Sequence, residues 1–192
     1  EIYTTTLNPA APATLLAGEY VNGNIWRSQD FGETWVDISS AAAAAGGTKP
    51  WRGFASSAGG QNIVAAVAGG NLWRSANAGN TWTEITSTGG GKDWKRIASS
   101  EKGEKLVASA YGGNLWRSHD AGTTWTEIVN TGANKKWRAV SSSADGNKVL
   151  AAVADDTSGN LWHSNDAGET WTEIISTGIG KDWRCTASSA AP

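Results

Sequence analysis

Short runs of apolar and β-branched residues alternate with Gly, Asn, Asp and Ser along most of the chain. Within residues 51–88 the runs read "WRGFASS", "NIVAAVA", "NLWRS" and "TWTEITST". Runs of this length between turn-forming residues predict β-strands, and none is long and periodic enough for a helix. Neighbours such as Leu72 and Trp73 are both large and apolar, which predicts strands that are buried on both faces.

The tryptophans reveal an internal repeat that covers the chain. The twelve Trp residues fall into four sets of three: 26, 35 and 51; 73, 82 and 94; 116, 125 and 137; 162, 171 and 183. Four short strands in about 45 residues, joined by tight turns, are typical of one blade of a β-propeller. A solenoid is the alternative, although the usual coils of about 20 to 30 residues match this period poorly. We therefore predict an all-β propeller with four blades in a single domain.

The ends of the repeat raise the question of how such a ring closes. The predicted blades cover about 3–40, 51–87, 94–131 and 137–177, and a further strand resembling a first strand follows at 183–190. This spare strand either lies beside the N-terminal blade and closes a ring of one chain, or pairs with another chain, because an unpaired edge invites addition. A closed monomer and a ring shared between two chains both follow from the pattern.

An octapeptide recurs in every unit, as "SQDFGETW", "SANAGNTW", "SHDAGTTW" and "SNDAGETW". The pattern S-x-D-x-G-x-T-W resembles the Asp-box, or BNR repeat, of sialidases, some other glycoside hydrolases and several non-enzymatic propellers. The resemblance implies a turn between the third and fourth strands of a blade, away from any active centre. The residues agree, since Asp30 can accept backbone N–H bonds in an Asx-turn and Gly32 can adopt positive φ. Asn77 replaces the carboxylate in the second unit, so we expect a structural role.

Enzymatic chemistry is not predicted. The resemblance to sialidases implies an arginine triad and a Tyr–Glu pair, but the arginines here occupy repeat positions and the Arg-Ile-Pro signature is absent. Glycoside hydrolysis needs two carboxylates in different environments, whereas Asp37, Glu84, Glu127 and Glu173 occupy equivalent positions. Two histidines and one cysteine predict no metal site, and nothing predicts a cofactor. We expect no catalytic residues.

The candidate ligand-binding residues are basic and aromatic pairs at the start of each first strand. They are Trp51 and Arg52, Trp94 and Lys95, Trp137 and Arg138, and Trp183 and Arg184. An indole can stack on a sugar ring while the cations bind its hydroxyl or acidic groups, and repetition gives avidity. In the alternative interpretation, the indoles pack between blades and the cations pair with the carboxylates at 37, 84, 127 and 173.

Charge and hydropathy narrow the class of partner. Sixteen basic and eighteen acidic residues give a net charge of −2 without a basic stripe, which argues against nucleic acid. The longest apolar run, five alanines at 41–45, is too short to span a membrane. The chain opens with "EIYTTT" instead of Met, so we expect a chain that is processed or excised from a longer precursor, and an extracellular or secreted location. The predicted function is a lectin-like module for glycans, and the alternative is an interaction scaffold that self-assembles through its C-terminal strand into homo-oligomers.

Overall fold

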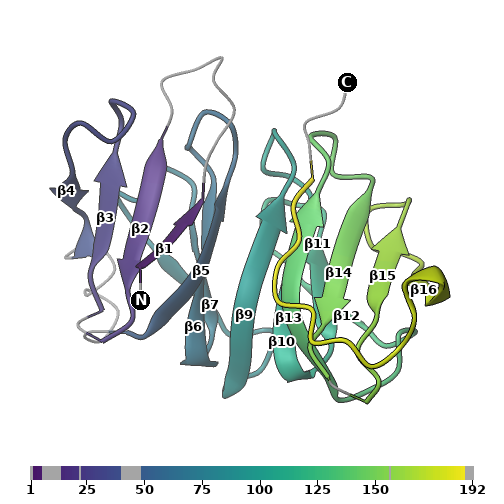
Figure 1. Ribbon diagram of the computed structural model, residues 1–192. Coiled ribbons are helices and arrows are strands. Elements are labelled where there is room, and N and C mark those ends of the chain that lie inside the picture. Colours follow the sequence, from purple (N-terminus) through teal and green to yellow (C-terminus); the bar gives the residue numbers. More distant parts are fainter. Residues whose placement is uncertain (1, 6–13, 22, 40–48, 156, 189–192) are drawn as a thin grey trace.

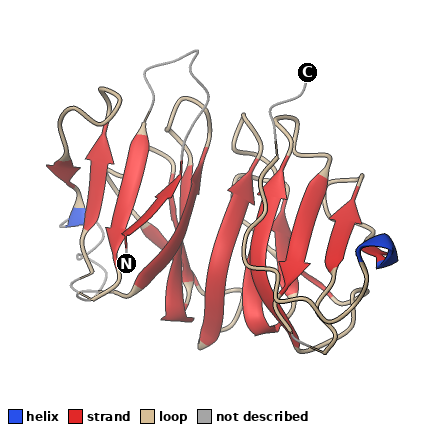
Figure 2. Ribbon diagram, in the orientation of Figure 1, coloured by secondary structure: helices blue, strands red, loops and turns tan. Residues whose placement is uncertain are grey.

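The computed structural model is built from β-strands. It describes residues 2–5, 14–21, 23–39, 49–155 and 157–188; residues 40, 41–45 and 189–190, which figured in the sequence predictions, lie outside the described residues. The described part holds sixteen strands and a short 3₁₀ helix, η1 (Ile175–Thr177). Figure 2 shows the strands running side by side, with turns and loops at both ends.

The strands fall into four units of four. The first unit contains β1 (Ile2–Thr5), β2 (Leu15–Glu19), β3 (Ile25–Ser28) and β4 (Val36–Asp37). The second contains β5 (Trp51–Ser56), β6 (Ile63–Gly70), β7 (Leu72–Ser75) and β8 (Thr83–Ile85). The third contains β9 (Lys92–Ser99), β10 (Leu106–Gly113), β11 (Leu115–Ser118) and β12 (Thr126–Ile128). The fourth contains β13 (Lys135–Ser142), β14 (Val149–Val153), β15 (Leu161–Ser164) and β16 (Thr172–Ile174).

Each unit is an antiparallel meander in which every strand pairs with the next one along the chain. In the second unit, for example, Ala65 of β6 lies opposite Phe54 on one side and Trp73 on the other. The fourth strands are two or three residues long, because the Asp-box turn takes up the residues before them. The units follow one another in a row, from purple to yellow in Figure 1.

Backbone pairing also joins consecutive units. The end of β6 pairs with the start of β9, with Ala68 opposite Asp93 and Gly70 opposite Lys92. The third and fourth units are joined in the same way, through Tyr111 and Lys136. These bridges merge the last three units into one 12-stranded sheet, while the first unit forms a separate sheet of four strands.

The apolar core of the described residues consists of three clusters. Each one lies at a junction, by which we mean the contact between two consecutive units. In every junction the earlier unit contributes three aliphatic side chains and the later unit contributes three tryptophans. At the second junction these are Val64, Leu72 and Ile85 against Trp94, Trp116 and Trp125. At the third they are Val107, Leu115 and Ile128 against Trp137, Trp162 and Trp171. Each unit therefore has an aliphatic face and a tryptophan face, and the second and third units bury the two faces against different neighbours.

The C-terminal tail does not form the predicted closing strand. Residues 183–188 have no strand structure, and an isolated bridge between Asp182 and Ala154 holds the tail against its own fourth unit. This bridge uses the place at which β9 and β13 begin in the earlier junctions, because the tail carries the sequence of a first strand. Among the described residues no strand pairing joins the first unit to the fourth, so the sheets do not close into a ring.

Candidate functional site

The Asp-box is a hydrogen-bonded turn that recurs in all four units. In the first, the Ser28 hydroxyl accepts the Gly32 N–H at 2.8 Å and donates to the Asp30 carboxylate at 2.7 Å. Asp30 also accepts the Thr34 N–H at 2.9 Å and the Thr34 hydroxyl. In the second unit Asn77 reproduces this arrangement with its amide. The turn therefore needs a short side chain with an acceptor oxygen at this position, and the carboxylate charge is dispensable.

Two successive residues of each box adopt positive φ. Glycine holds the second position, as predicted, but Phe31, Ala78, Ala121 or Ala167 holds the first, with φ between 56° and 59°. Hydrogen bonds from the side chain and N–H of Thr34 lower the pKa of Asp30 to about 2, and Thr170 does the same to the pKa of Asp166. A carboxylate bonded in this way stays ionised at neutral pH and cannot serve as a general acid. The box is a structural turn.

The arginine on the third strand connects each box to the preceding unit. Arg74 Nε donates to the carbonyl of Ala121 in the next box at 2.9 Å, and Arg27 donates to the carbonyl of Ala78. Arg117 instead forms an ion pair with Glu169 in the fourth box. These arginines hold the junctions together, which accounts for their recurrence in the repeat.

The structure places the predicted stacking tryptophans in the core. Trp51, Trp94 and Trp137 are between 0% and 1% exposed, and the indoles of Trp51 and Trp94 donate to the Gly23 and Gly70 carbonyls of the preceding unit. They do not form the exposed platform that the sequence suggested, because the tryptophan face of each unit is covered by its neighbour. Trp183, on the tail, is partly exposed.

The basic residues that follow these tryptophans occupy a special backbone position. The first-strand registers pass from Trp51 to Gly53, from Trp94 to Arg96 and from Trp137 to Ala139 while the partner strand advances by one residue. Arg52, Lys95 and Arg138 are thus the extra residues of three β-bulges. A bulge re-aims the side chain of its extra residue and is common beside binding sites.

Two tyrosines stack with the bulged cations. The guanidinium of Arg52 lies 4.6 Å from the ring centroid of Tyr20, and that of Arg138 lies 4.9 Å from the ring centroid of Tyr111. Lys95 Nζ is also 4.9 Å from the Tyr111 ring. Tyr20 is 37% exposed and Tyr111 is partly exposed. We call Tyr20, Arg52, Lys95, Tyr111 and Arg138 the basic–aromatic row.

The cations of the basic–aromatic row differ in their hydrogen-bond and ion-pair partners. Lys95 is 7% exposed and forms an ion pair with Asp93 at 2.6 Å. Arg138 Nε is buried and has no hydrogen-bond partner among the described residues. Such a donor is costly unless a partner completes it. Arg184, which corresponds to the row on the tail, is exposed and donates to Asp182 at 2.7 Å.

The predicted ion pairs between the first-strand cations and the fourth-strand carboxylates are not seen among the described residues of the second, third and fourth units. Glu84, Glu127 and Glu173 accept hydrogen bonds from amides of their own units, at 3.0, 3.0 and 2.7 Å. The donors are Asn71, Asn114 and Asn160, which open the third strands. Each Asn lies at the start of the third strand, which pairs with the fourth strand that carries the Glu. The bulged cations lie on the first strand of the unit, which is not next to the fourth.

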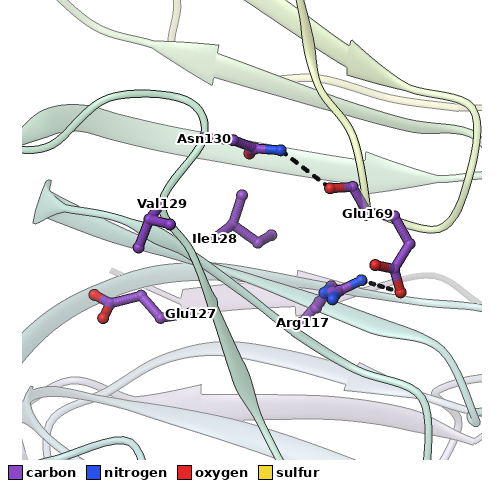
Figure 3. A pocket seen from close by; sticks show the side chains of 7 residues that line it. Arg117, Glu127, Ile128, Val129, Asn130 and Glu169 are labelled. Carbon is purple, nitrogen blue, oxygen red and sulfur yellow. Dashed lines mark hydrogen bonds and ion pairs between the residues drawn. The ribbon is translucent and has the colours of Figure 1, made fainter.

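A pocket opens at the third junction, outside the basic–aromatic row. It has a volume of about 160 Å³ and lies between β11, β12 and the fourth Asp-box. Figure 3 shows Arg117 and Asn130 pointing to Glu169, with Glu127 and Val129 at the other side. Asn130 Nδ2 donates to the Glu169 carbonyl at 3.1 Å, and His119 Nδ1 lies 3.8 Å from the Glu169 carboxylate. Arg117 and Glu169, which line the pocket, form an ion pair with each other.

Sequence reasoning missed the tyrosines of the row. Tyr20 and Tyr111 occupy one repeat position, which Ala68 and Ala154 fill in the other units. The sequence marks these tyrosines only as departures from the repeat. That signal is weaker than the recurrence of the tryptophans, which belong to the core. His119, Asn130 and Glu169 at the pocket occupy positions that vary from unit to unit.

In the part of the chain that the structure describes, no group of three or more His, Cys, Asp or Glu side chains could hold a metal ion. Over the same residues no helix has the length and apolar character required to cross a membrane.

Two family models match the sequence. Residues 70–190 match the model described as sortilin, neurotensin receptor 3, of the Sortilin-Vps10 family. Residues 25–38 match the BNR-Asp box repeat, which confirms the resemblance drawn from the octapeptide. No match was found among curated proteins.

Solved structures share the fold at low sequence identity. A GH74 xyloglucanase from Xanthomonas campestris is 21% identical with a TM-score of 0.65, over 84% of this chain and 28% of that one. YCF48 from Cyanidioschyzon merolae is 15% identical with a TM-score of 0.63, over 95% and 61% of the two chains. A nidogen/laminin complex gives 14% identity and a TM-score of 0.62, over 83% and 60%. The chain thus spans less than two thirds of the length of these structures.

Proposed function

This chain belongs to the Sortilin-Vps10 family, and from that premise we propose that it is a non-enzymatic binding module whose ligand is a carbohydrate bearing acidic groups. The ligand binds along the basic–aromatic row. The observation that carries the proposal is the repeated Tyr–Arg stack on a β-bulge, present at Tyr20 with Arg52 and at Tyr111 with Arg138.

The chemistry of the row favours an acidic sugar over a neutral one. A guanidinium binds a carboxylate or sulfate with two parallel hydrogen bonds, and Arg138 has a buried Nε–H that lacks a partner among the described residues. A partly exposed tyrosine ring offers the apolar face of a sugar a stacking surface. The nearby Asp93 carboxylate is already paired with Lys95, so the row has cationic character where a ligand would lie.

A purely binding role is supported by the carboxylates. Those of the Asp-boxes are held ionised by hydrogen bonds, and those of Glu84, Glu127 and Glu173 repeat one environment with one amide partner. Glycosidase chemistry needs two carboxylates whose surroundings separate their pKa values. The likeness to a xyloglucanase, at 21% identity, shows the fold and does not bear on the ligand or on catalysis.

The test is titration calorimetry of the chain with two families of oligosaccharide. One family contains uronic acids, and the other consists of neutral xyloglucan fragments. We expect the acidic family to bind, with affinity that falls as salt rises. Binding of neither family would overturn the proposal, and binding of the neutral family alone would overturn its acidic component.

Two variants assign the binding to the row. Arg138→Gln removes the charge and the paired donors, and we expect an affinity loss of about tenfold or more, since hydrogen bonds to charged groups are worth about 1.5–3 kcal/mol. Lys102→Gln is the matched control, because it removes one positive charge from an exposed turn outside the row. Equal losses in the two variants would show that only net charge matters.

A further inference from the structure

The two ends of the row of units carry complementary faces. At each junction, an aliphatic face of the earlier unit covers a tryptophan face of the later unit. The tryptophan face of the first unit is formed by Leu15, Trp26 and Trp35, and none of these residues belongs to the three core clusters of the described residues. The aliphatic face of the fourth unit, formed by Leu150, Leu161 and Ile174, likewise belongs to none of them.

Burial shows that both faces are incompletely covered. Leu115 in the third junction is fully buried, whereas Leu161 at the equivalent position of the fourth unit is partly exposed. Trp82 in the first junction is 9% exposed, whereas Trp35, its counterpart in the first unit, is 38% exposed. Exposed apolar surface of this kind marks an interaction site more often than an ordinary surface.

The residues of the polar contact differ in the first and fourth units. At the junctions a third-strand arginine meets a small residue of the next box, as Arg74 meets Ala121. The corresponding residue on the third strand of the fourth unit is His163, and the corresponding box residue of the first unit is Phe31. Phe31 is 66% exposed, so the tryptophan face of the first unit carries a further exposed aromatic ring beside Trp35.

We propose that a second copy of this chain docks head to tail, with the tryptophan face of its first unit on the aliphatic face of the fourth unit. The contact continues an interface that the chain already forms three times, which is why a second copy is the occupant. Residues 181–183 of the tail begin at the first-strand place beside the fourth unit, where Asp182 bridges Ala154. The second copy therefore contributes mainly through β3 and β4, which carry Trp26 and Trp35.

The contact is heterologous, because each copy uses a different surface. Two copies that meet at both ends form a closed ring, and copies that meet at one end only form a chain of copies. The proposal is independent of the ligand, since the basic–aromatic row lies on the first strands and the residues beside them. Failure of one proposal leaves the other standing.

Sedimentation equilibrium of the chain at about 1 to 100 µM tests the proposal. We expect an average mass that rises with concentration from 20.0 kDa to twice that value or a higher multiple. Trp35→Glu and Leu161→Glu each place a carboxylate in one of the two faces, and we expect each variant alone to stay at 20.0 kDa. Val129→Glu is the matched control, because Val129 is an exposed apolar residue outside both faces, and it should associate like the unaltered chain.

Mixing the two variants separates a head-to-tail contact from loss of folding. Each variant keeps one unaltered face, so a mixture of Trp35→Glu and Leu161→Glu should recover a mass of twice 20.0 kDa through a single contact. A constant mass of 20.0 kDa for the unaltered chain, or association that persists in both variants, would overturn the proposal. Failure of the mixture to associate would also overturn it, provided that both variants keep the circular dichroism of the parent.

Discussion

Replacing Trp94 by alanine distinguishes a core residue from a ligand platform. Trp94 is completely buried at the second junction, its indole donates to the Gly70 carbonyl at 3.1 Å, and its ring packs edge-on against Trp116 at 6.2 Å. Truncation of a buried Trp costs about 3–5 kcal/mol, and the acceptor left behind adds to that loss. Since domains of this size are stable by about 5–15 kcal/mol, we expect Trp94→Ala to lose a large part of the free energy of unfolding.

The assay is urea unfolding followed by circular dichroism and tryptophan fluorescence. Trp183→Ala is the matched control, since it removes the same side chain from the partly exposed tail; we expect a loss of about 1 kcal/mol or less. Because each core cluster joins only two consecutive units, loss of Trp94 should also separate the two halves of the transition and lower its steepness. A loss below about 1 kcal/mol for Trp94→Ala would refute this account of the core.

Three further predictions concern the turns. Asp166→Ala should cost about 0.5–1.5 kcal/mol in urea unfolding because the exposed Thr170 N–H exchanges its carboxylate acceptor for water, whereas Asp166→Asn should cost much less, as the natural Asn77 turn shows. The pKa values of Asp30 and Asp166 are lowered to about 2 in the folded protein. The stability that these carboxylates contribute is therefore complete above about pH 4 and is lost as the pH falls through about 2. In acid unfolding, Asp30→Asn should lose less stability than the unaltered chain over that range. Gly146→Ala and Gly112→Ala share a φ of 71°, but only at Gly146 would the new Cβ meet other atoms, at 2.8 Å; Gly146→Ala should therefore have the lower midpoint of thermal unfolding, and equal midpoints would refute the steric argument.

The fold was largely predictable because one physical demand recurs four times. Each unit must cover a tryptophan face and offer an aliphatic face, so Trp, Leu and the Asp-box glycines return at fixed spacing, and the four-stranded units follow from that spacing. The match of residues 25–38 to the BNR-Asp box repeat confirms that the octapeptide is an Asp-box. Ring closure was not predictable, since it depends on how consecutive units rotate against one another, and no local pattern records that rotation.

The candidate site was predictable only in part. The sequence drew attention to Arg52 and Arg138, and the structure places both on bulges, but a bulge is a shift of register between two strands and leaves no mark in either strand alone. The same sequence pattern presented Trp51 and Trp137 as ligand platforms. Recurrence favours residues needed at every junction, so the most repeated aromatic residues are the ones that the neighbouring unit buries.

Residues that depart from the repeat therefore carry more information about function than residues that obey it. Tyr20 and Tyr111 replace alanine in the first and third units only, and each stacks on the cation of the following bulge. The two stacks lie at the first and third junctions, with the second junction between them, so one extended oligosaccharide can engage both while a monosaccharide engages one. Linked contacts of this kind raise affinity through effective concentration without any new interaction. We accordingly expect affinity to rise steeply with oligosaccharide length up to the span of two units, and Tyr111→Ala to remove that dependence on length while leaving the binding of short fragments at Tyr20 intact.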